Sequence, residues 1–379
     1  MKRLEANWIT APETVAVMQA LGGEAFFVGG CVRNTLLGIP VTDIDLATPL
    51  LPDEVTRRAE KAGLKTVPTG IDHGTVTVIS ESTSFEVTTF RRDIQTDGRR
   101  AVVAFSSEIS DDAARRDFTM NALYATADGE IMDPLGGLAD LNARKVRFIL
   151  DPVERIREDA LRILRFFRFS AWYSEEIEPE GLAACAAHAG DVDGLARERI
   201  GSEIIKLLSA PDPSQAVAAM AACGVLMRIL PGANPEALAP LVSRDAEAGV
   251  APDALTRLAA LAPAEVDLRL PKSSMRRLAA IRQIIDENTP PAIAAQDHGA
   301  ETAIAGHLVL TSLSSEAWEP IAAEIARGAK AIFPLTAADL MAAGIPEGPD
   351  IGTRLAEARD AWIESGFALE RDELLRRFS

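Results

Sequence analysis

The sequence predicts an α+β protein, with a mixed sheet near the N-terminus and an all-helical remainder. Over the first 140 residues, helix signals alternate with short runs rich in β-branched residues. From about residue 153 onward, apolar residues recur with the 3.6-residue period of helices, interrupted by Pro and Gly. The 379 residues, 47% of them hydrophobic, suffice for two or three compact units.

Proline and glycine mark the limits of two predicted N-terminal helices, 12–22 and 52–63. Four short runs are predicted strands: 25–28, 44–47, 74–80 and 85–90. The last two, GTVTVIS and FEVTTF, are separated by the polar residues ESTS, which predicts a hairpin. The turn-forming run DPLGGLADL then places the boundary to the helical region near residues 140–150.

One helix is predicted to begin near Pro152 and to continue through Arg168. Steps of three residues place Asp159 beside Arg162, and Arg165 and Arg168 continue the same polar stripe. Within that stripe three arginines share one carboxylate neighbour. We therefore expect positive charge that a group outside the helix must match, although an exposed helix with ordinary ion pairs is the alternative.

Composition excludes several classes of protein. No apolar run is long enough to cross a bilayer, and the first residues lack the apolar core of a secretory signal. Three cysteines without metal-like spacing and four scattered histidines argue against zinc and favour a reducing cytoplasm. A net charge of −17 argues, by itself, against a nucleic-acid partner. Nevertheless, residues 141–168 carry +4, and a second arginine cluster lies in a turn-rich stretch at 91–100.

The most specific pattern is Gly29-Gly30 between a strand and a helix, followed by Asp43 and Asp45 on the next strand. Residues i and i+2 of a strand face the same side, so the two carboxylates repel each other unless a cation such as Mg²⁺ lies between them. Backbone N–H groups at the glycines can approach phosphate oxygens, and Arg33 can add charge there. The alternative is that the aspartates only cap a turn and the glycines only end a strand.

A third carboxylate, Glu86, alternates with apolar neighbours on the predicted strand FEVTTF. If this strand pairs beside Asp43 and Asp45, Glu86 completes a three-carboxylate cradle for one or two metal ions. Otherwise Glu86 only marks the solvent face of its strand.

A further polar run, RRDFTMNAL, begins with two adjacent arginines, Arg115 and Arg116. Guanidinium groups bind phosphates, and Asp117 or Asn121 can form a hydrogen bond with a ribose hydroxyl. A helix start with surface Arg–Asp pairs is the alternative.

An Asp and an Arg held side by side can distinguish nucleobases. The Asp accepts from an exocyclic amino group, and the Arg donates to the adjacent ring nitrogen. Cytosine and adenine present this combination, whereas uracil and guanine present the reverse. Asp159 and Arg162 would therefore accept C and A, and a wrong base would leave buried groups unpaired, at a cost of about 1–3 kcal/mol each.

The motifs GGCVRNTLLGIPVTDIDLAT, HGTVTV, FEVTTFRRD, RRDFTMNAL, DPLGGLADL and EDALRILRFFRF resemble, in this order, those of the class II tRNA nucleotidyltransferase and bacterial poly(A) polymerase family. This family is a branch of the polymerase-β-like nucleotidyltransferases. The close resemblance covers residues 24–168 and continues weakly through ARERIGSEIIKLL. It implies a catalytic head over 1–145, a helical neck with the base-reading helix over 146–210, and a tRNA-binding body and tail over 211–379.

The resemblance also implies template-independent addition of C, C and A to tRNA 3′ ends from CTP and ATP, with Mg²⁺ and release of pyrophosphate. By the family's pattern, Asp43 and Asp45 bind the metal and Glu86 looks like the third catalytic carboxylate. The implied nucleotide contacts are Gly30, Arg33, Arg116, Asp159, Arg162, Arg165 and Arg168.

Asn34 departs from the pattern, because the family usually has Asp after this arginine. That puts one supporting hydrogen bond in doubt. A poly(A) polymerase or an enzyme that adds only CC or only A would use the same head, and a catalytically silent RNA-binding module is a remote alternative. The acidic C-terminal half favours one defined tRNA shape over synthesis on arbitrary RNA.

Overall fold

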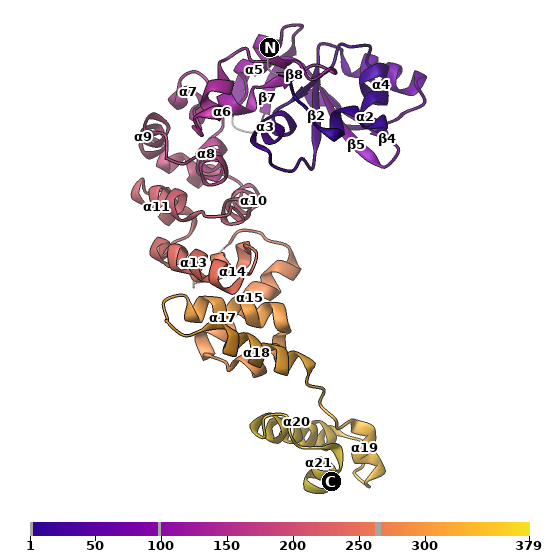
Figure 1. Ribbon diagram of the computed structural model, residues 1–379, viewed down its shortest axis with the longest axis vertical. Helices are drawn as coiled ribbons and strands as arrows, with labels where there is room; N and C mark the ends of the chain where they lie inside the picture. The colour runs from indigo at the N-terminus through magenta and orange to yellow at the C-terminus, as the bar shows by residue number, and fades with distance from the viewer. Residues whose placement is uncertain (1–2, 98–99, 262–266) are drawn as a thin grey trace. The chain divides into compact units, whose positions relative to one another are not determined.

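The computed structural model describes residues 3–97, 100–261 and 267–379 and divides into two compact units (Figure 1). The first unit comprises Met1–Pro235 and Ala264–Arg269, and the second comprises Glu236–Pro263 and Leu270–Ser379. In the described residues no helix is long and apolar enough to cross a membrane. The α+β class and the mixed sheet predicted from the sequence are confirmed.

A seven-stranded sheet, in the order β3-β4-β5-β2-β1-β8-β9, forms the centre of the first unit. Only β2 and β5 are parallel among its neighbouring pairs. Its strands are β1 (Phe26–Val28), β2 (Ile44–Thr48), β3 (Lys65–Gly70), β4 (Thr75–Ser80), β5 (Thr83–Thr89), β8 (Tyr124–Ala125) and β9 (Ile131–Met132). All four predicted strands and the β4–β5 hairpin are therefore present.

Two parts of the sheet region differ from the prediction. The edge strand β3 contains Pro68 and is largely exposed, so it lacks the apolar alternation of a half-buried strand. The stretch expected to be turns is instead a separate antiparallel pair, β6 (Arg91–Asp97) and β7 (Arg100–Phe105). Arg99 of the predicted arginine cluster lies outside the described residues.

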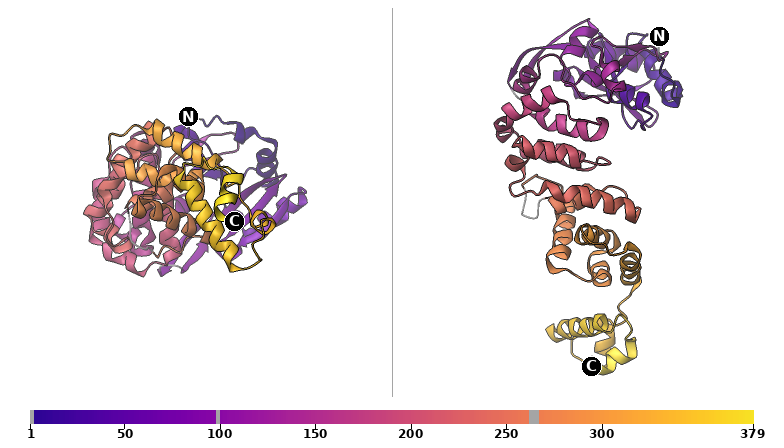
Figure 2. Two further views of the ribbon diagram at one scale, coloured as in Figure 1. Left: turned by 90° about the horizontal axis from the view of Figure 1, so that it is seen from below. Right: turned by 60° about the vertical axis from the view of Figure 1, so that its left-hand side comes forward.

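Helices cover the sheet and then continue as a helical region of the same unit (Figure 2). α2 and α4 pack against β4. The α-helices of this unit are α1 (Asn7–Thr10), α2 (Pro12–Ala20), α3 (Gly30–Leu37), α4 (Pro52–Lys61), α5 (Ile109–Ala114), α6 (Gly137–Asn142), α7 (Pro152–Glu158), α8 (Leu161–Tyr173), α9 (Pro179–Ala187), α10 (Arg197–Leu208), α11 (Ser214–Ala222) and α12 (Val225–Ile229). Short 3₁₀ turns are η1 (Ile71–His73), η2 (Thr119–Asn121) and η3 (Ala189–Gly194).

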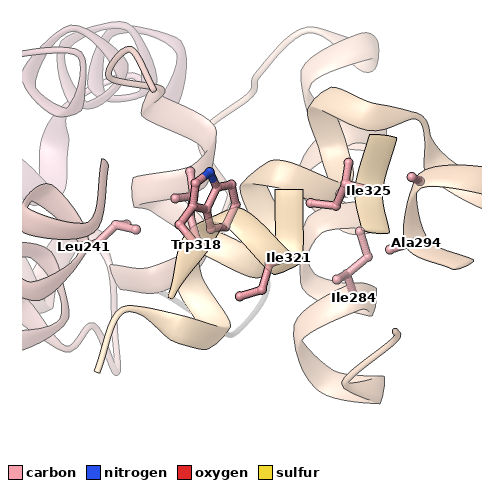
Figure 3. Close-up of a cluster of buried hydrophobic side chains, with 9 residues drawn as sticks. Leu241, Ile284, Ala294, Trp318, Ile321 and Ile325 are labelled. Carbon is pink, nitrogen blue, oxygen red and sulfur yellow. The ribbon is translucent and has the colours of Figure 1, made fainter. Parts of the chain in front are cut away.

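The second unit is helical throughout its described residues, as the 3.6-residue periodicity predicts. Its helices are α13 (Leu238–Ala248), α14 (Ala254–Leu261), α15 (Lys272–Glu287), α16 (Pro291–His298), α17 (Ala300–Thr311), α18 (Trp318–Lys330), α19 (Ala337–Ala342), α20 (Pro349–Glu364) and α21 (Arg371–Phe378). Figure 3 shows one of its cores, in which Trp318, Ile321 and Ile325 of α18 pack with Leu241 and Ile284. A separate core around Trp362 joins α19, α20 and α21.

Gly137, in the run DPLGGLADL, allows α6 to approach the backbone of η2, which carries Asn121. A Cβ atom at Gly137 would lie 2.1 Å from the carbonyl oxygen of Thr119. Because this neighbour is backbone, no side-chain rotation can relieve the overlap. The glycine therefore sets how closely α6 packs against a segment that lines the cavity described below.

We predict that Gly137→Ala lowers the free energy of unfolding by about 1–3 kcal/mol, because the added methyl group overpacks this contact. Urea unfolding followed by circular dichroism measures the change. The matched control is Gly352→Ala in α20, where nothing lies within 4 Å of the added Cβ. That variant should be unchanged or more stable by about 0.5–1 kcal/mol, and equal effects of the two substitutions would contradict the explanation.

Candidate active site

A cavity of about 660 Å³ lies within the first unit and collects the predicted site residues. Its lining residues come from the sheet region and from the helices that follow: Gly29, Gly30, Arg33, Asn34, Val41, Thr42, Asp43, Asp45, Arg115, Arg116, Asp117, Asn121, Asp159, Leu161, Arg162, Arg165, Arg168, Phe169, Tyr173 and Arg199. All the predicted site residues except Glu86 are among them.

The Gly29-Gly30 pair turns the chain from β1 into α3. Gly29 has a φ of 69°, a conformation that residues with side chains rarely adopt. A Cβ atom there would also lie 3.4 Å from Nη1 of Arg116. The backbone at the start of α3 is consequently open to the cavity, where its N–H groups can meet an anion.

The parallel pairing of β2 and β5 places Glu86 beside Asp45, and Asp43 directly precedes β2. The register pairs Asp45 with Glu86, while Phe85 and Val87 are buried on the opposite face. Burial raises the pKa of the Asp45 carboxyl, and Glu86 raises it further, followed by Asp43, with Arg116 opposing them. The predicted adjacency of the two strands is therefore confirmed.

The carboxylates suit a hard divalent cation, although they do not form a closed ligand set. Across residues 3–97, 100–261 and 267–379, no three His, Cys, Asp or Glu side chains are grouped closely enough to hold a metal ion. Asp43 and Asp45 line the cavity, whereas the exposed Glu86 does not. Burial first, and then the neighbouring carboxylates Glu86 and Asp43, raise the pKa of Asp45, and a bound cation would offset both effects, so the donor chemistry fits.

Arg115 and Arg116 are held by one buried carboxylate, Asp112 at the end of α5. Asp112 Oδ1 accepts from Arg115 Nε at 2.8 Å, and Oδ2 accepts from Arg116 Nη2 at 2.9 Å and from the Tyr124 hydroxyl at 2.6 Å. Burial would raise the pKa of Asp112, but the two arginines outweigh it and lower the pKa. The ion pairs with Asp112 thus fix the orientation of both arginines, which line the cavity.

The prediction of one helix from Pro152 through Arg168 is wrong. α7 ends at Glu158, Asp159 is extended with φ −154° and ψ 105°, and α8 begins at Leu161. Asp159 Oδ1 accepts from the backbone N–H of Leu161 at 3.1 Å, a local side-chain hydrogen bond at the start of α8. The Asp side chain competes locally for backbone donors, which periodicity alone does not register.

This break changes the partners of the predicted base-reading pair. Asp159 Oδ2 accepts from Arg199 Nη2 at 2.6 Å, and Arg162 forms an ion pair with Glu158. Arg162 also donates to the backbone oxygens of Arg155, at 2.8 Å, and Arg115, at 3.1 Å. The expected direct Asp159–Arg162 pairing is therefore replaced by separate partners, yet both side chains line the cavity.

The expectation that a group outside the helix matches the charge of Arg165 and Arg168 is confirmed, because carboxylates from distant elements pair with both arginines. Arg165 Nε donates to Asp117 Oδ2 at 2.7 Å, and Arg168 Nε lies 2.9 Å from Glu203 Oε2 of α10. Burial would raise the pKa of Asp117, but Arg165 and Asn121 lower it to about 2. Asp117 and Glu203 are both buried, so these ion pairs position the two arginines firmly.

Arg33 differs from the other arginines of the cavity. Its hydrogen-bond partners in the described residues are neutral: Asn34 Oδ1 at 2.9 and 3.1 Å, the Tyr173 hydroxyl at 2.9 Å, and Asn121 Oδ1. Its guanidinium also lies 4.2 Å from the centre of the Tyr173 ring. Burial lowers the pKa of Arg33. In the described part of the chain no carboxylate forms an ion pair with it, so its charge is available to an anion.

Asn34, the departure from the family's pattern, forms hydrogen bonds with Arg33 and with the backbone of the following loop. Its Oδ1 accepts twice from Arg33, and its Nδ2 donates to the Pro40 carbonyl at 3.2 Å. Sequence reasoning did not identify Arg199, Phe169 or Tyr173 as cavity residues. Arg199 lies in the weakly matching run ARERIGSEIIKLL, which was the only available signal for it.

Two family models match the chain. The Poly A polymerase head domain matches residues 25–147, and the probable RNA- and SrmB-binding site of polymerase A matches residues 176–236. The chain is 33% identical to the mouse mitochondrial CCA tRNA nucleotidyltransferase 1 over 375 residues, which span 93% of this chain and 86% of the relative. The human counterpart is 31% identical over similar coverage.

Bacterial relatives and solved structures point to the same family as the mammalian relatives. The Levilactobacillus brevis CCA-adding enzyme is 40% identical over 227 residues, 59% of this chain and 56% of the relative, so the match spans about half the length of that protein. The crystal structure of the Bacillus stearothermophilus CCA-adding enzyme in complex with CTP aligns with a TM-score of 0.76, 27% identity and 93% coverage of both chains. The Thermotoga maritima enzyme complexed with tRNA shares the fold, with a TM-score of 0.71 at 18% identity. This chain belongs to the CCA-adding enzyme family of nucleotidyltransferases.

Proposed function

We propose that this protein adds C, C and A to the 3′ end of tRNA from CTP and ATP and releases pyrophosphate. The observation that carries the proposal is the convergence, in one cavity, of the Asp43–Asp45 pair, the unpaired cation Arg33 and the base-reading candidates Asp159 and Arg162. The names of the relatives support the same reaction. The cavity is large enough for a nucleoside triphosphate.

Asp43 and Asp45 would hold a divalent metal ion, which we infer to be Mg²⁺, with Glu86 as a third carboxylate beside them. When bound, the metal would lower the pKa of the attacking 3′-hydroxyl and neutralise the negative charge of the departing pyrophosphate. The carboxylates themselves provide negative charge at the start of β2, in the cavity that the arginines also line.

Arg33, Arg116 and the backbone at Gly30 bind the triphosphate in this proposal. Arg33 has neutral hydrogen-bond partners and is only 7% exposed. An entering phosphate would therefore form the first ion pair of its guanidinium group. Arg116 already forms an ion pair with Asp112, so it adds little net positive charge to the site. Its contribution is to orient the triphosphate through hydrogen bonds. Together these groups orient the α-phosphate toward the carboxylates.

Asp159 and Arg162 read the base. Each already has a protein partner, Arg199 or Glu158, which fixes its orientation while leaving other lone pairs or N–H groups for a ligand. A preorganised acceptor and donor of this kind match the amino group and ring nitrogen of C and A. Arg165 and Arg168, held by Asp117 and Glu203, support the base or the phosphates from α8.

We further infer three regions: a catalytic head over 1–145, a neck over 146–210, and a tRNA-binding body and tail over 211–379. The match of an RNA-binding family model to residues 176–236 supports contact with RNA beyond the head. Three free cysteines support a cytoplasmic location. A poly(A) polymerase, or an enzyme that adds only CC or only A, is the second candidate, since the head-domain model is named for poly(A) polymerases.

The decisive assay incubates the protein with tRNA that lacks its 3′-terminal CCA and with each labelled NTP, alone and in combination. We expect CTP to add two residues, ATP to add one residue after CC, and UTP and GTP to add none. Sequencing gels measure the length of each product. Long A tracts would indicate a poly(A) polymerase, and no incorporation with any nucleotide would refute the proposed enzyme.

We predict that Asp43→Ala reduces incorporation at least 1,000-fold, about 4 kcal/mol of transition-state stabilisation, while binding of tRNA stays nearly unchanged. The metal-binding charge is lost, but no RNA contact is assigned to this carboxylate. Asp53→Ala, at an exposed position in the first turn of α4, is the control and should retain activity. Retention of full activity by Asp43→Ala would exclude the metal role.

We predict that Asp159→Ala and Arg162→Ala each relax the exclusion of UTP by about tenfold or more, because one member of the reading pair is lost. Competition between CTP and UTP, compared as kcat/KM, measures the change. Arg157→Ala is the control, since Arg157 is 60% exposed and pairs only with the exposed Glu154 among the ion pairs of the described residues. Unchanged exclusion of UTP in both variants would rule out base reading by this pair.

A further inference from the structure

A second cavity, of about 360 Å³, adjoins the nucleotide cavity within the first unit. The two share part of their lining, including Arg33, Thr42 and Tyr173. The second cavity is lined in addition by residues of the loop after α3 and of α8 and α10: Ile39, Pro40, Trp172, Lys206 and Ser209. The proposed function assigns no role to these residues.

Trp172 presents a fixed aromatic surface at this cavity. Its side chain is among the exposed large apolar groups, with 36% of its surface accessible. The indole Nε1 donates to the backbone oxygen of Lys206 at 2.8 Å, which holds the ring against α10. Phe169 and Tyr173 stack beside it with ring centres 5.7 Å apart and an interplanar angle of 29°. Three aromatic residues therefore line a space that opens toward the nucleotide site.

Cationic groups accompany these rings. Lys206 is exposed at the cavity, and among the ion pairs of the described residues none involves it. Arg168 also lines the cavity, although Glu203 balances its charge. Aromatic faces beside a free positive charge are the usual means of binding unpaired nucleotides, because every base can stack and every linkage carries a phosphate.

We propose that this cavity binds an unpaired nucleotide of the RNA strand whose 3′-hydroxyl reacts, with the base against Trp172 and a phosphate near Lys206. Thr42 lines both cavities and directly precedes Asp43, so a strand held in the second cavity leads toward the carboxylates of the first. A volume of about 360 Å³ is at the lower end of ligand sites, which suits one nucleotide. This proposal rests on the proposed function, because it requires an RNA substrate.

The test compares Trp172→Ala, Trp172→Phe and the full-length parent protein. We expect Trp172→Ala to raise the dissociation constant for tRNA lacking CCA about tenfold, the effect of one lost stacking contact. The KM for CTP should stay unchanged, and Trp172→Phe should restore most of the affinity. Met227→Ala is the matched control, because Met227 is an exposed apolar residue of the same unit and lines neither cavity.

Lys206→Ala provides an independent measurement that leaves the backbone partner of Trp172 in place. The slope of log affinity against log salt for the RNA should become shallower by about 0.7, the loss of one phosphate contact on a single strand. Thermal melting followed by circular dichroism checks that each variant is folded.

Unchanged RNA affinity in folded Trp172→Ala and Lys206→Ala would overturn the proposal, and so would an increase in the KM for CTP that matches the loss of RNA affinity. A photoreactive 4-thiouridine at the terminal position of the tRNA should cross-link to Trp172 or its neighbours, and cross-linking only elsewhere would count equally against it. These outcomes are separable from the proposed function, which fails if the parent protein incorporates no nucleotide.

Discussion

Charge balance among the arginines of one cavity is the constraint on which the site depends. Seven arginines line a space of about 660 Å³, and like charges so close together repel each other. Most of these arginines form ion pairs with buried carboxylates from separate parts of the chain, namely Asp112, Asp117 and Glu203. Removing one partner of such a buried pair typically costs about 3–5 kcal/mol, so the arginines are positioned before any substrate arrives. Among the cavity arginines of the described structure, Arg33 alone keeps neutral partners, and it is the arginine that we propose to bind a phosphate.

This arrangement explains how an acidic protein can have an anion-binding site. The net charge of −17 is a sum over the whole chain, whereas binding depends on the field within a few ångströms of the ligand. The carboxylates of Asp43 and Asp45 line the same cavity as the arginines of α3, of α8 and of the segment directly after α5. In the proposed function, such a site holds a metal ion and a polyphosphate together, and the acidic remainder of the chain is expected to limit binding to generic RNA.

The sequence predicted those features that local patterns encode. The β4–β5 hairpin, the glycine turn before α3 and the i, i+2 placement of Asp43 and Asp45 all depend on neighbouring residues. The break at Asp159 escaped prediction because its side chain forms a local hydrogen bond with the backbone N–H of Leu161, which periodicity does not register. β8 and β9 are two residues long, too short for any periodicity to appear.

By itself, the sequence determined the fold class, the family and the charged residues of the cavity other than Arg199, because their types and spacing are local and specific. Only the tertiary structure decided which charges meet. The carboxylate that pairs with Arg165 belongs to Asp117, 48 residues away along the chain. The arginine that pairs with Asp159 is Arg199, 40 residues away. The Asp159–Arg199 pair follows from the packing of α8 against α10, and no regular spacing along the chain predicts either pairing. The same packing places Trp172 beside Lys206 and creates the second cavity.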